Sequence, residues 1–212
     1  MTALQLVIGN RRYSSWSLRG WLALRLAGLP VETEVIWLDE PGSKEALTAA
    51  SPAATVPVLQ LPEGALWDSL AIGLYAAESA PALWPSDPAE RRLAYALTAE
   101  MHSAFAALRK ALPMDFSRVG QPLAPEALAE PALAADLARF RAVWSRAKPG
   151  GFYFGEPGLI DCFYAPVASR FRSYAIDLPA DAEAYCQTLL DWPLVREWEA
   201  EAALETRIIA DP

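Results

Sequence analysis

In the first eighty residues, short apolar runs alternate with longer segments whose apolar positions have helical spacing. Residues 4–8 form a short run that is apolar except for Gln5, which is typical of a buried central strand. Residues 16–27 fit a largely buried helix, and Gly28 and Pro30 supply the usual signals for its end. The pattern predicts further strands at residues 33–38, 56–61 and 65–67, and further helices at residues 43–50 and 68–78.

The predicted order β-α-β-α-β-β-α restricts the topology. A strand-helix-strand unit implies a parallel pair joined by a right-handed crossover. The turn at residues 62–64, Pro-Glu-Gly, implies an antiparallel pair. Glu32 and Glu34 fall on one face of the second strand, which suits an exposed edge. These features predict a small mixed sheet with helices on its faces.

Beyond residue 88, few strand-like runs remain, and apolar residues recur at spacings of three and four. Helices are predicted at residues 89–112, 125–147, 160–174, 182–190 and 194–204. A proline-rich stretch, residues 81–88, separates the two regions. We therefore predict an α/β domain at residues 1–80 and an all-helical domain at residues 88–212.

The composition restricts the class of function. Of the 212 residues, 53% are hydrophobic and 21% charged, as in a globular protein, and the net charge of −8 argues against a nucleic-acid partner. The chain shows neither a secretory leader nor an apolar stretch of about 18 residues, so we expect a cytoplasmic protein without membrane contact. One histidine, two cysteines (Cys162 and Cys186) and no Cys-x-x-Cys pair argue against a metal site.

The segment YSSWSLR, residues 13–19, joins the first predicted strand to the first predicted helix. Serine is among the preferred helix N-caps, so capping alone would account for its hydroxyls. A helix N-terminus also presents free N–H groups and the positive end of the helix dipole, so it could hold a thiolate or a carboxylate. The segment alone supports both interpretations.

Two further segments allow similar pairs of interpretations. In ATVPVLQL, Pro57 can simply begin a strand, whereas a cis Val56–Pro57 bond would present the Val56 backbone to a ligand. In WDSLAI, Asp68 and Ser69 can cap a helix. They can also bind the amino-acid end of a ligand, with the serine and helix N–H groups taking the carboxylate and Asp68 the ammonium group.

A fourth segment, FGEPGLIDCFYAPV, places Asp161 three residues after Gly158. This is capping-box spacing with glycine in place of serine or threonine, and we interpret it as structural.

In this order and spacing, the four segments resemble the glutathione S-transferase family, of a bacterial type, over nearly the whole chain. The resemblance implies a thioredoxin-like N-terminal domain with a mixed four-stranded sheet, followed by an all-helical C-terminal domain. Ser14, Ser15, Ser17 and Arg19 are also similar to the serine motif of the zeta class, the maleylacetoacetate isomerases. Trp16 stands where that motif has a cysteine.

The resemblance implies glutathione as a co-substrate. Ser14, or as second choice Ser15, would donate a hydrogen bond to the glutathione sulfur and lower the pKa of its thiol. The serine would then be a donor, and the sulfur the nucleophile. By position, the other contacts with glutathione would be Val56 and Pro57 at its cysteinyl backbone, Asp68 and Ser69 at its γ-glutamyl end, and Lys44 at its glycine carboxylate.

The small electrophile would bind between the sheet and the first long helix of the C-terminal domain. His102, Phe105 and Arg109 can share one stripe of that predicted helix, where they could hold an anionic substrate. The residues predicted for this part of the site are Tyr13, Met101, His102, Phe105 and Arg109. We expect Trp16 to be a core residue.

Functions of two classes remain open. The chain is either an enzyme that conjugates glutathione or uses it for isomerisation of the maleylacetoacetate type, or a glutathione-transferase-like binding module without catalysis. The complete set of predicted glutathione contacts favours the enzyme. The lack of a Cys-x-x-Cys pair argues against a thioredoxin-type redox protein. Because the family usually forms two-fold dimers, we expect a homodimer.

Overall fold

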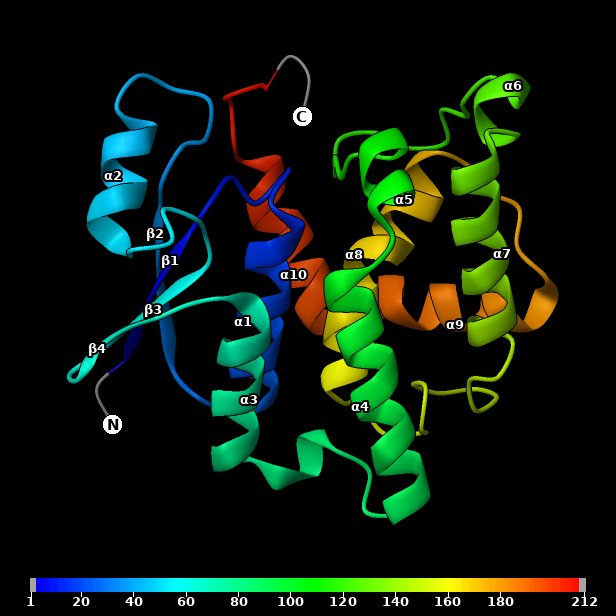
Figure 1. Cartoon of the computed structure of the whole chain (residues 1–212), viewed down its shortest axis with the longest axis horizontal. Helices are drawn as coiled ribbons and strands as arrows, with labels where there is room; N and C mark the ends of the chain where they lie inside the picture. The colour runs from blue at the N-terminus through cyan, green and yellow to red at the C-terminus, as the bar shows by residue number, and fades with distance from the viewer. Residues whose placement is uncertain (1–2, 210–212) are drawn as a thin grey trace.

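The computed structural model describes residues 3–209, in which a mixed four-stranded sheet is followed by a set of helices (Figure 1). The strands are β1 (Leu4–Ile8), β2 (Val31–Val35), β3 (Val58–Leu61) and β4 (Gly64–Leu66). They lie in the order β2-β1-β3-β4. β1 is parallel to β2 and antiparallel to β3, and β3 is antiparallel to β4. The predicted order of elements and the mixed thioredoxin-like sheet are confirmed.

Three helices accompany the sheet: α1 (Ser15–Leu26), α2 (Ser43–Ala50) and α3 (Ser69–Ser79). Leu6 and Ile8 of the central strand β1 are fully buried. Glu32 and Glu34 of β2 are exposed, as expected of an edge strand. α1 packs against α3 and also contacts α8 and α10 of the helical part. The N-terminal half of the chain thus meets the C-terminal half along α1.

The helical part follows a short 3-10 turn, η1 (Pro81–Leu83). Its helices are α4 (Pro88–Ser103), α5 (Ala106–Ala111), α6 (Pro125–Leu128), α7 (Pro131–Trp144), α8 (Leu159–Ser173), α9 (Ala180–Asp191) and α10 (Pro193–Ala203). Almost every residue of α8 is buried, because α1, α4 and α9 all pack against it. None of the helices described is both long enough and apolar enough to cross a membrane.

Two predicted helices are each divided in the structure. The helix predicted at residues 89–112 is interrupted between α4 and α5, where Phe105 has a left-handed backbone with φ of 64°. The helix predicted at residues 125–147 is interrupted before Pro131, because proline begins a helix far more readily than it continues one. The first break turns Phe105 into the core, where its ring centroid lies 4.4 Å from that of Phe140.

Candidate functional site

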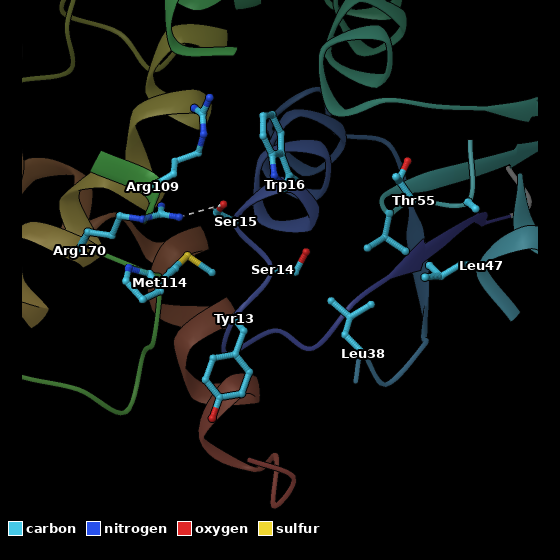
Figure 2. Close-up of a pocket in the computed structure, with 13 residues that line it drawn as sticks. Tyr13, Ser14, Ser15, Trp16, Leu38, Leu47, Thr55, Arg109, Met114 and Arg170 are labelled. Carbon is cyan, nitrogen blue, oxygen red and sulfur yellow. Dashed lines mark hydrogen bonds between the residues drawn. The ribbon is translucent and has the colours of Figure 1, made fainter. Parts of the chain in front are cut away.

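Two adjoining cavities lie at the N-terminus of α1, and Figure 2 shows the larger of them. The larger has a volume of about 410 Å³ and the smaller about 230 Å³, and Trp16, Thr55 and Val56 line both. The larger is also lined by Tyr13, Ser14, Ser15, Leu38, Leu47, Ala54, Arg109, Pro113, Met114 and Arg170. The smaller is also lined by Pro57, Asp68, Ser69 and His102. Together they have the size of a small-molecule site.

Ser14 is the N-cap of α1, and its hydroxyl group lies at the larger cavity. Its Oγ accepts a hydrogen bond from the Ser17 backbone N–H at 3.3 Å and lies 2.8 Å from Ser17 Oγ, which itself accepts from the Gly9 N–H at 3.0 Å. A hydroxyl has one proton and two acceptor positions. If Ser17 directs its proton to Ser14, both acceptor positions of Ser14 are filled. The proton of Ser14 is then left for a ligand in the cavity.

Ser15 accepts a hydrogen bond from Arg170 Nη2 at 3.2 Å (Figure 2). Arg170 comes from α8, and it also donates to the carbonyl groups of Leu112 at 2.7 Å and Pro166 at 3.0 Å, so its guanidinium is fixed. Burial, and then the nearby Arg109, lower the pKa of Arg170 to about 10, which leaves it cationic at neutral pH. A cation that donates to Ser15 polarises this hydroxyl and makes its proton a better donor.

The indole of Trp16 lies among cations. The guanidinium carbon of Arg19 is 4.6 Å from its ring centroid and that of Arg109 is 5.3 Å away, both within cation–π range. Trp16 is half-buried and lines both cavities, so the prediction that it is a core residue is wrong.

Arg19 is fully buried, and its only hydrogen bond runs from Nε to the Phe163 carbonyl at 3.3 Å among the residues described. The pKa of Arg19 is lowered mainly because the side chain is buried, and to a smaller extent because Arg170 and Arg109 repel its charge. Within residues 3–209, no carboxylate lies at ion-pair distance from any of these three arginines. The site therefore concentrates positive charge in a chain whose net charge is −8.

The N-terminus of α3 forms the wall of the smaller cavity. Asp68 caps this helix by accepting from the N–H groups of Leu70 at 2.9 Å and Ala71 at 3.3 Å. Its Oδ2 lies 3.1 Å from Nε2 of His102. The pKa of His102 is nevertheless lowered, because the effect of burial exceeds the opposing effect of Asp68. The Ser69 hydroxyl is buried without a partner among the described residues. Since an unpaired buried hydroxyl is unfavourable, a polar ligand atom fits here.

The Val56–Pro57 peptide bond is cis, the isomer that the sequence left open, and Val56 lines both cavities. At the helix caps, the structural interpretation of Asp161 also fits: the side chain accepts from the Gly158 N–H at 2.8 Å. The part of the chain that the structure describes contains no group of three or more His, Cys, Asp or Glu side chains able to hold a metal ion.

Three of the predicted site residues line neither cavity. Lys44 is exposed on α2. Met101 and Phe105 were expected to face the electrophile, but both lie in the hydrophobic core. For Phe105 the break between α4 and α5 accounts for the difference, because it turns this ring toward Phe140. Met101 lies within α4, on the face that is buried in the core.

The cavity also contains residues that the sequence reasoning missed. Arg170 had one usable signal, since it is a charged residue in a helical segment that is mostly apolar. The others are Leu38, Leu47, Ala54, Thr55, Pro113 and Met114, most of them in loops, and nothing in their sequence context marks them.

Comparison with known proteins gives consistent results. Residues 13–79 match the family described as the glutathione S-transferase N-terminal domain. No curated protein sequence matches the chain. Among solved structures, a bacterial maleyl pyruvate isomerase, a zeta-class glutathione S-transferase, is 26% identical with a TM-score of 0.73, and the alignment covers 96% of this chain and 100% of the other.

Two further structures contain bound glutathione. A theta-class glutathione S-transferase of Xanthomonas axonopodis is 25% identical, with a TM-score of 0.66 and coverage of 93% of this chain and 97% of the other. A glutathione transferase homologue from Burkholderia is 22% identical, with a TM-score of 0.71 and coverage of 95% and 99%. The chain therefore has the glutathione-transferase fold. Its residues 13–79 match the N-terminal domain of the glutathione S-transferase family.

Proposed function

We propose that this protein is a glutathione transferase that activates glutathione as a thiolate for attack on a small electrophile. The observation that carries the proposal is that Ser14, Ser15, Val56 and Ser69 all line two adjoining cavities, and that the Ser69 hydroxyl has no partner among the described residues. A free thiol has a pKa of about 8.5 and is mostly protonated at neutral pH. A serine hydrogen bond and the N-terminus of α1 both stabilise the thiolate.

Glutathione would lie across both cavities. Asp68 and Ser69 would bind its γ-glutamyl end, and Val56 and Pro57 its cysteinyl backbone, which brings the sulfur toward the start of α1. Lys44 would reach the glycine carboxylate from α2, the helix whose Leu47 lines the larger cavity. Two structurally similar proteins were crystallised with glutathione bound, which supports this use of the fold.

A second candidate is glutathione-dependent isomerisation of a carboxylate substrate. Arg109 and Arg170 line the larger cavity and Arg19 lies behind Trp16, with no carboxylate partner for any of them among the described residues. An anionic substrate would offset this positive charge. Tyr13 and His102, on two sides of the cavities, would complete the electrophile site. The similarity to a maleyl pyruvate isomerase also favours this candidate.

A direct test is retention on immobilised glutathione, followed by titration of the bound thiol through its thiolate ultraviolet absorbance. We expect the protein to lower the thiol pKa by about one to two units, and Ser14→Ala to reverse about one of these, with Ser15→Ala as the second serine variant. Failure to bind glutathione at millimolar concentration would contradict the proposal. Binding without any shift of the thiol pKa would identify the protein as a non-catalytic module.

We also propose a homodimer that forms through α3 and α4. Large apolar side chains are exposed before α3 (Trp67), on α3 (Leu74) and on α4 (Tyr95). Exposed apolar groups on neighbouring elements are typical of a protein interface. Light scattering should give twice the chain mass, and Leu74→Lys should yield the monomer.

A further inference from the structure

The loop that leads into the serines is held by the opposite end of the chain. Residues 10–13, which we call the serine loop, connect β1 to the cap of α1. Glu205 follows α10 and is only 7% exposed. Its Oε1 accepts from the Arg11 backbone N–H at 2.7 Å, and its Oε2 accepts from the Arg12 N–H at 3.1 Å. Each oxygen of one carboxylate thus binds a separate amide of the serine loop.

The carbonyl groups of the same two residues are also bound from the helical part. Trp198 of α10 donates from Nε1 to the Arg11 carbonyl at 2.9 Å. The Phe116 N–H donates to the Arg12 carbonyl at 3.3 Å. In addition, Arg12 Nη2 donates to the Glu205 carbonyl at 2.9 Å. The backbone polar groups of Arg11 and Arg12 therefore all bond to residues more than a hundred positions later in the sequence.

The conformation of the serine loop sets the position of Ser14. The Asn10 carbonyl accepts from the N–H of Tyr13 at 3.1 Å and from that of Ser14 at 2.8 Å, so the loop closes directly onto the cap. Among residues 3–209, the other hydrogen bonds of Ser14 go to Ser17 and Leu18 of α1, and none goes directly to the helical part. The serine loop is therefore the direct hydrogen-bonded link between Ser14 and the C-terminal segment.

The segment that carries Glu205 is itself fixed to the other side of the cavity. Arg207 forms an ion pair with Glu40 at 3.2 Å, and its guanidinium carbon lies 4.7 Å from the ring centroid of Trp37. Nearby, the Leu38 N–H donates to Asn10 Oδ1 at 2.8 Å, and Leu38 lines the larger cavity. Figure 1 shows this segment, in red, running past the loop before α1.

We propose that Glu205, together with Trp198, is a positioning residue for thiol activation. This inference rests on the proposed function. A hydrogen bond weakens steeply as its distance and angle depart from the optimum, so the serine must be held in place to stabilise the thiolate. Glu205 does this without contacting glutathione. Its loss would leave two N–H groups unpaired and would release the loop.

The test compares Glu205→Gln with Glu197→Gln in the full chain. In the first variant an amide NH₂ faces a backbone N–H, so one of the two bonds to the loop is lost. Glu197 is the matched control because it also joins α10 to the N-terminal half, through Arg25 at the far end of α1. Each variant is titrated with bound glutathione by thiolate absorbance, and kcat and KM for glutathione are measured with a standard electrophile.

We expect Glu205→Gln to raise the pKa of the bound thiol by about half a unit to one unit and to lower kcat at neutral pH about threefold to tenfold. KM for glutathione should change little, because Val56, Asp68 and Ser69 have no hydrogen bond to the serine loop among the described residues. Glu197→Gln should leave the thiol pKa unchanged. In a chain that already carries Ser14→Ala and Ser15→Ala, Glu205→Gln should add no further shift, since it acts through the serines.

The inference is overturned if Glu205→Gln binds glutathione with the thiol pKa of the original protein, or if both variants shift that pKa equally. If Glu205→Gln does not fold, Trp198→Phe replaces it. This variant removes the bond to the Arg11 carbonyl together with part of the buried ring that Trp21 and Arg11 contact. An unshifted thiol pKa would again overturn the inference. Failure of the proposed function looks different, because the unmodified protein itself would then fail to bind glutathione or to lower its thiol pKa.

Discussion

The helices α1 and α8 begin with similar capping chemistry, yet only one of these N-termini is a candidate site. At α8 the carboxylate of Asp161 is fully buried and accepts from Gly158 N at 2.8 Å, Tyr153 N at 3.0 Å and the Tyr185 hydroxyl at 2.6 Å. At α1 the cap is the hydroxyl of Ser14, whose hydrogen bonds among the described residues go only to Ser17 of the same helix, and Ser14 lines the larger cavity.

A cavity alone does not distinguish the two helix ends. A space of about 330 Å³ also borders Gly158 and Asp161. The difference lies in the hydrogen bonds that each cap has left to make. Asp161 is an acceptor whose oxygens already have donors. Ser15 accepts from Arg170 and keeps its own proton, and Ser14 does so when Ser17 donates to it. The comparison teaches that a helix cap can become a binding site when it borders a cavity and still has a hydrogen bond to make.

The largest expected effect comes from the N-terminus of α8, where the oxygens of the capping carboxylate already have donors. Asp161→Ala would leave two backbone N–H groups and one tyrosine hydroxyl unpaired in the core, so the free energy of unfolding should fall by about 3 to 5 kcal/mol. Chemical denaturation measures this loss. Asp191→Ala, at an exposed ion pair with Arg196, should leave the free energy of unfolding nearly unchanged. We expect the folded Asp161→Ala protein to keep the thiol pKa of bound glutathione. A shift of that pKa would contradict the view that the cap of α8 is structural only.

The second effect is the pH dependence of the same carboxyl group. Burial raises the pKa of Asp161 from its usual 3.8 to about 6, although its hydrogen-bond donors oppose the rise. Between these values the folded protein keeps a proton that the unfolded chain releases, so the free energy of unfolding falls as the pH rises from about 4 to about 6 and is then constant. The total is about 3 kcal/mol.

Urea denaturation from about pH 4 to about pH 7 checks this slope, with Asp161→Asn as the matched variant. The variant should lose the contribution because its side chain does not titrate. A slope of the opposite sign would show that the hydrogen bonds outweigh burial at this carboxylate. The serine caps of α1 add nothing to the slope, since their hydroxyls do not ionise in this range.

Much of the fold could be predicted because its elements are marked locally. The apolar run of β1, the edge pattern of Glu32 and Glu34 and the Pro-Glu-Gly turn each specify one piece of the mixed sheet. The division between α4 and α5 could not be predicted in this way. Its cause is tertiary: Leu108 N donates to Asp136 on α7, and Phe105 stacks in the core, so packing overrides a continuous helical pattern.

The candidate site was predictable where a residue lies at the start of an element. Ser14, Asp68 and Ser69 carry capping signals, and Pro57 marks a strand start. What the sequence could not show is which hydrogen bonds remain open. Trp16 looks like a core residue in sequence and lines both cavities, whereas Met101 fits a helical stripe and is buried. Arg170 reaches Ser15 across 155 positions, a separation that no local pattern encodes.

A smaller effect should show whether the cavity at the N-terminus of α1 binds an anionic electrophile. Arg109→Ala should raise KM for an electrophile that carries a carboxylate about tenfold more than for a neutral electrophile of similar reactivity, since an anion loses one cation in the cavity. Steady-state kinetics with the pair of electrophiles measures this ratio. Arg139→Ala is the control, because Arg139 forms a surface ion pair with Glu100 at 2.8 Å. Equal losses for both electrophiles would contradict an anionic substrate.

The smallest effect separates capping from chemistry at Ser14 itself. Ser14→Ala removes the acceptor of the Ser17 N–H and should lower the free energy of unfolding by about 1 kcal/mol, whereas Ser14→Gly should cost only a few tenths because glycine is tolerated as a cap. Both variants lack the hydroxyl, so both should raise the thiol pKa of bound glutathione by the same amount. Denaturation and thiol titration of the two proteins check this. The contrary result is a thiol pKa that rises in Ser14→Ala, the less stable variant, and stays unchanged in Ser14→Gly. Ser14 would then be only a cap, like Asp161, and the contrast between α1 and α8 would fail.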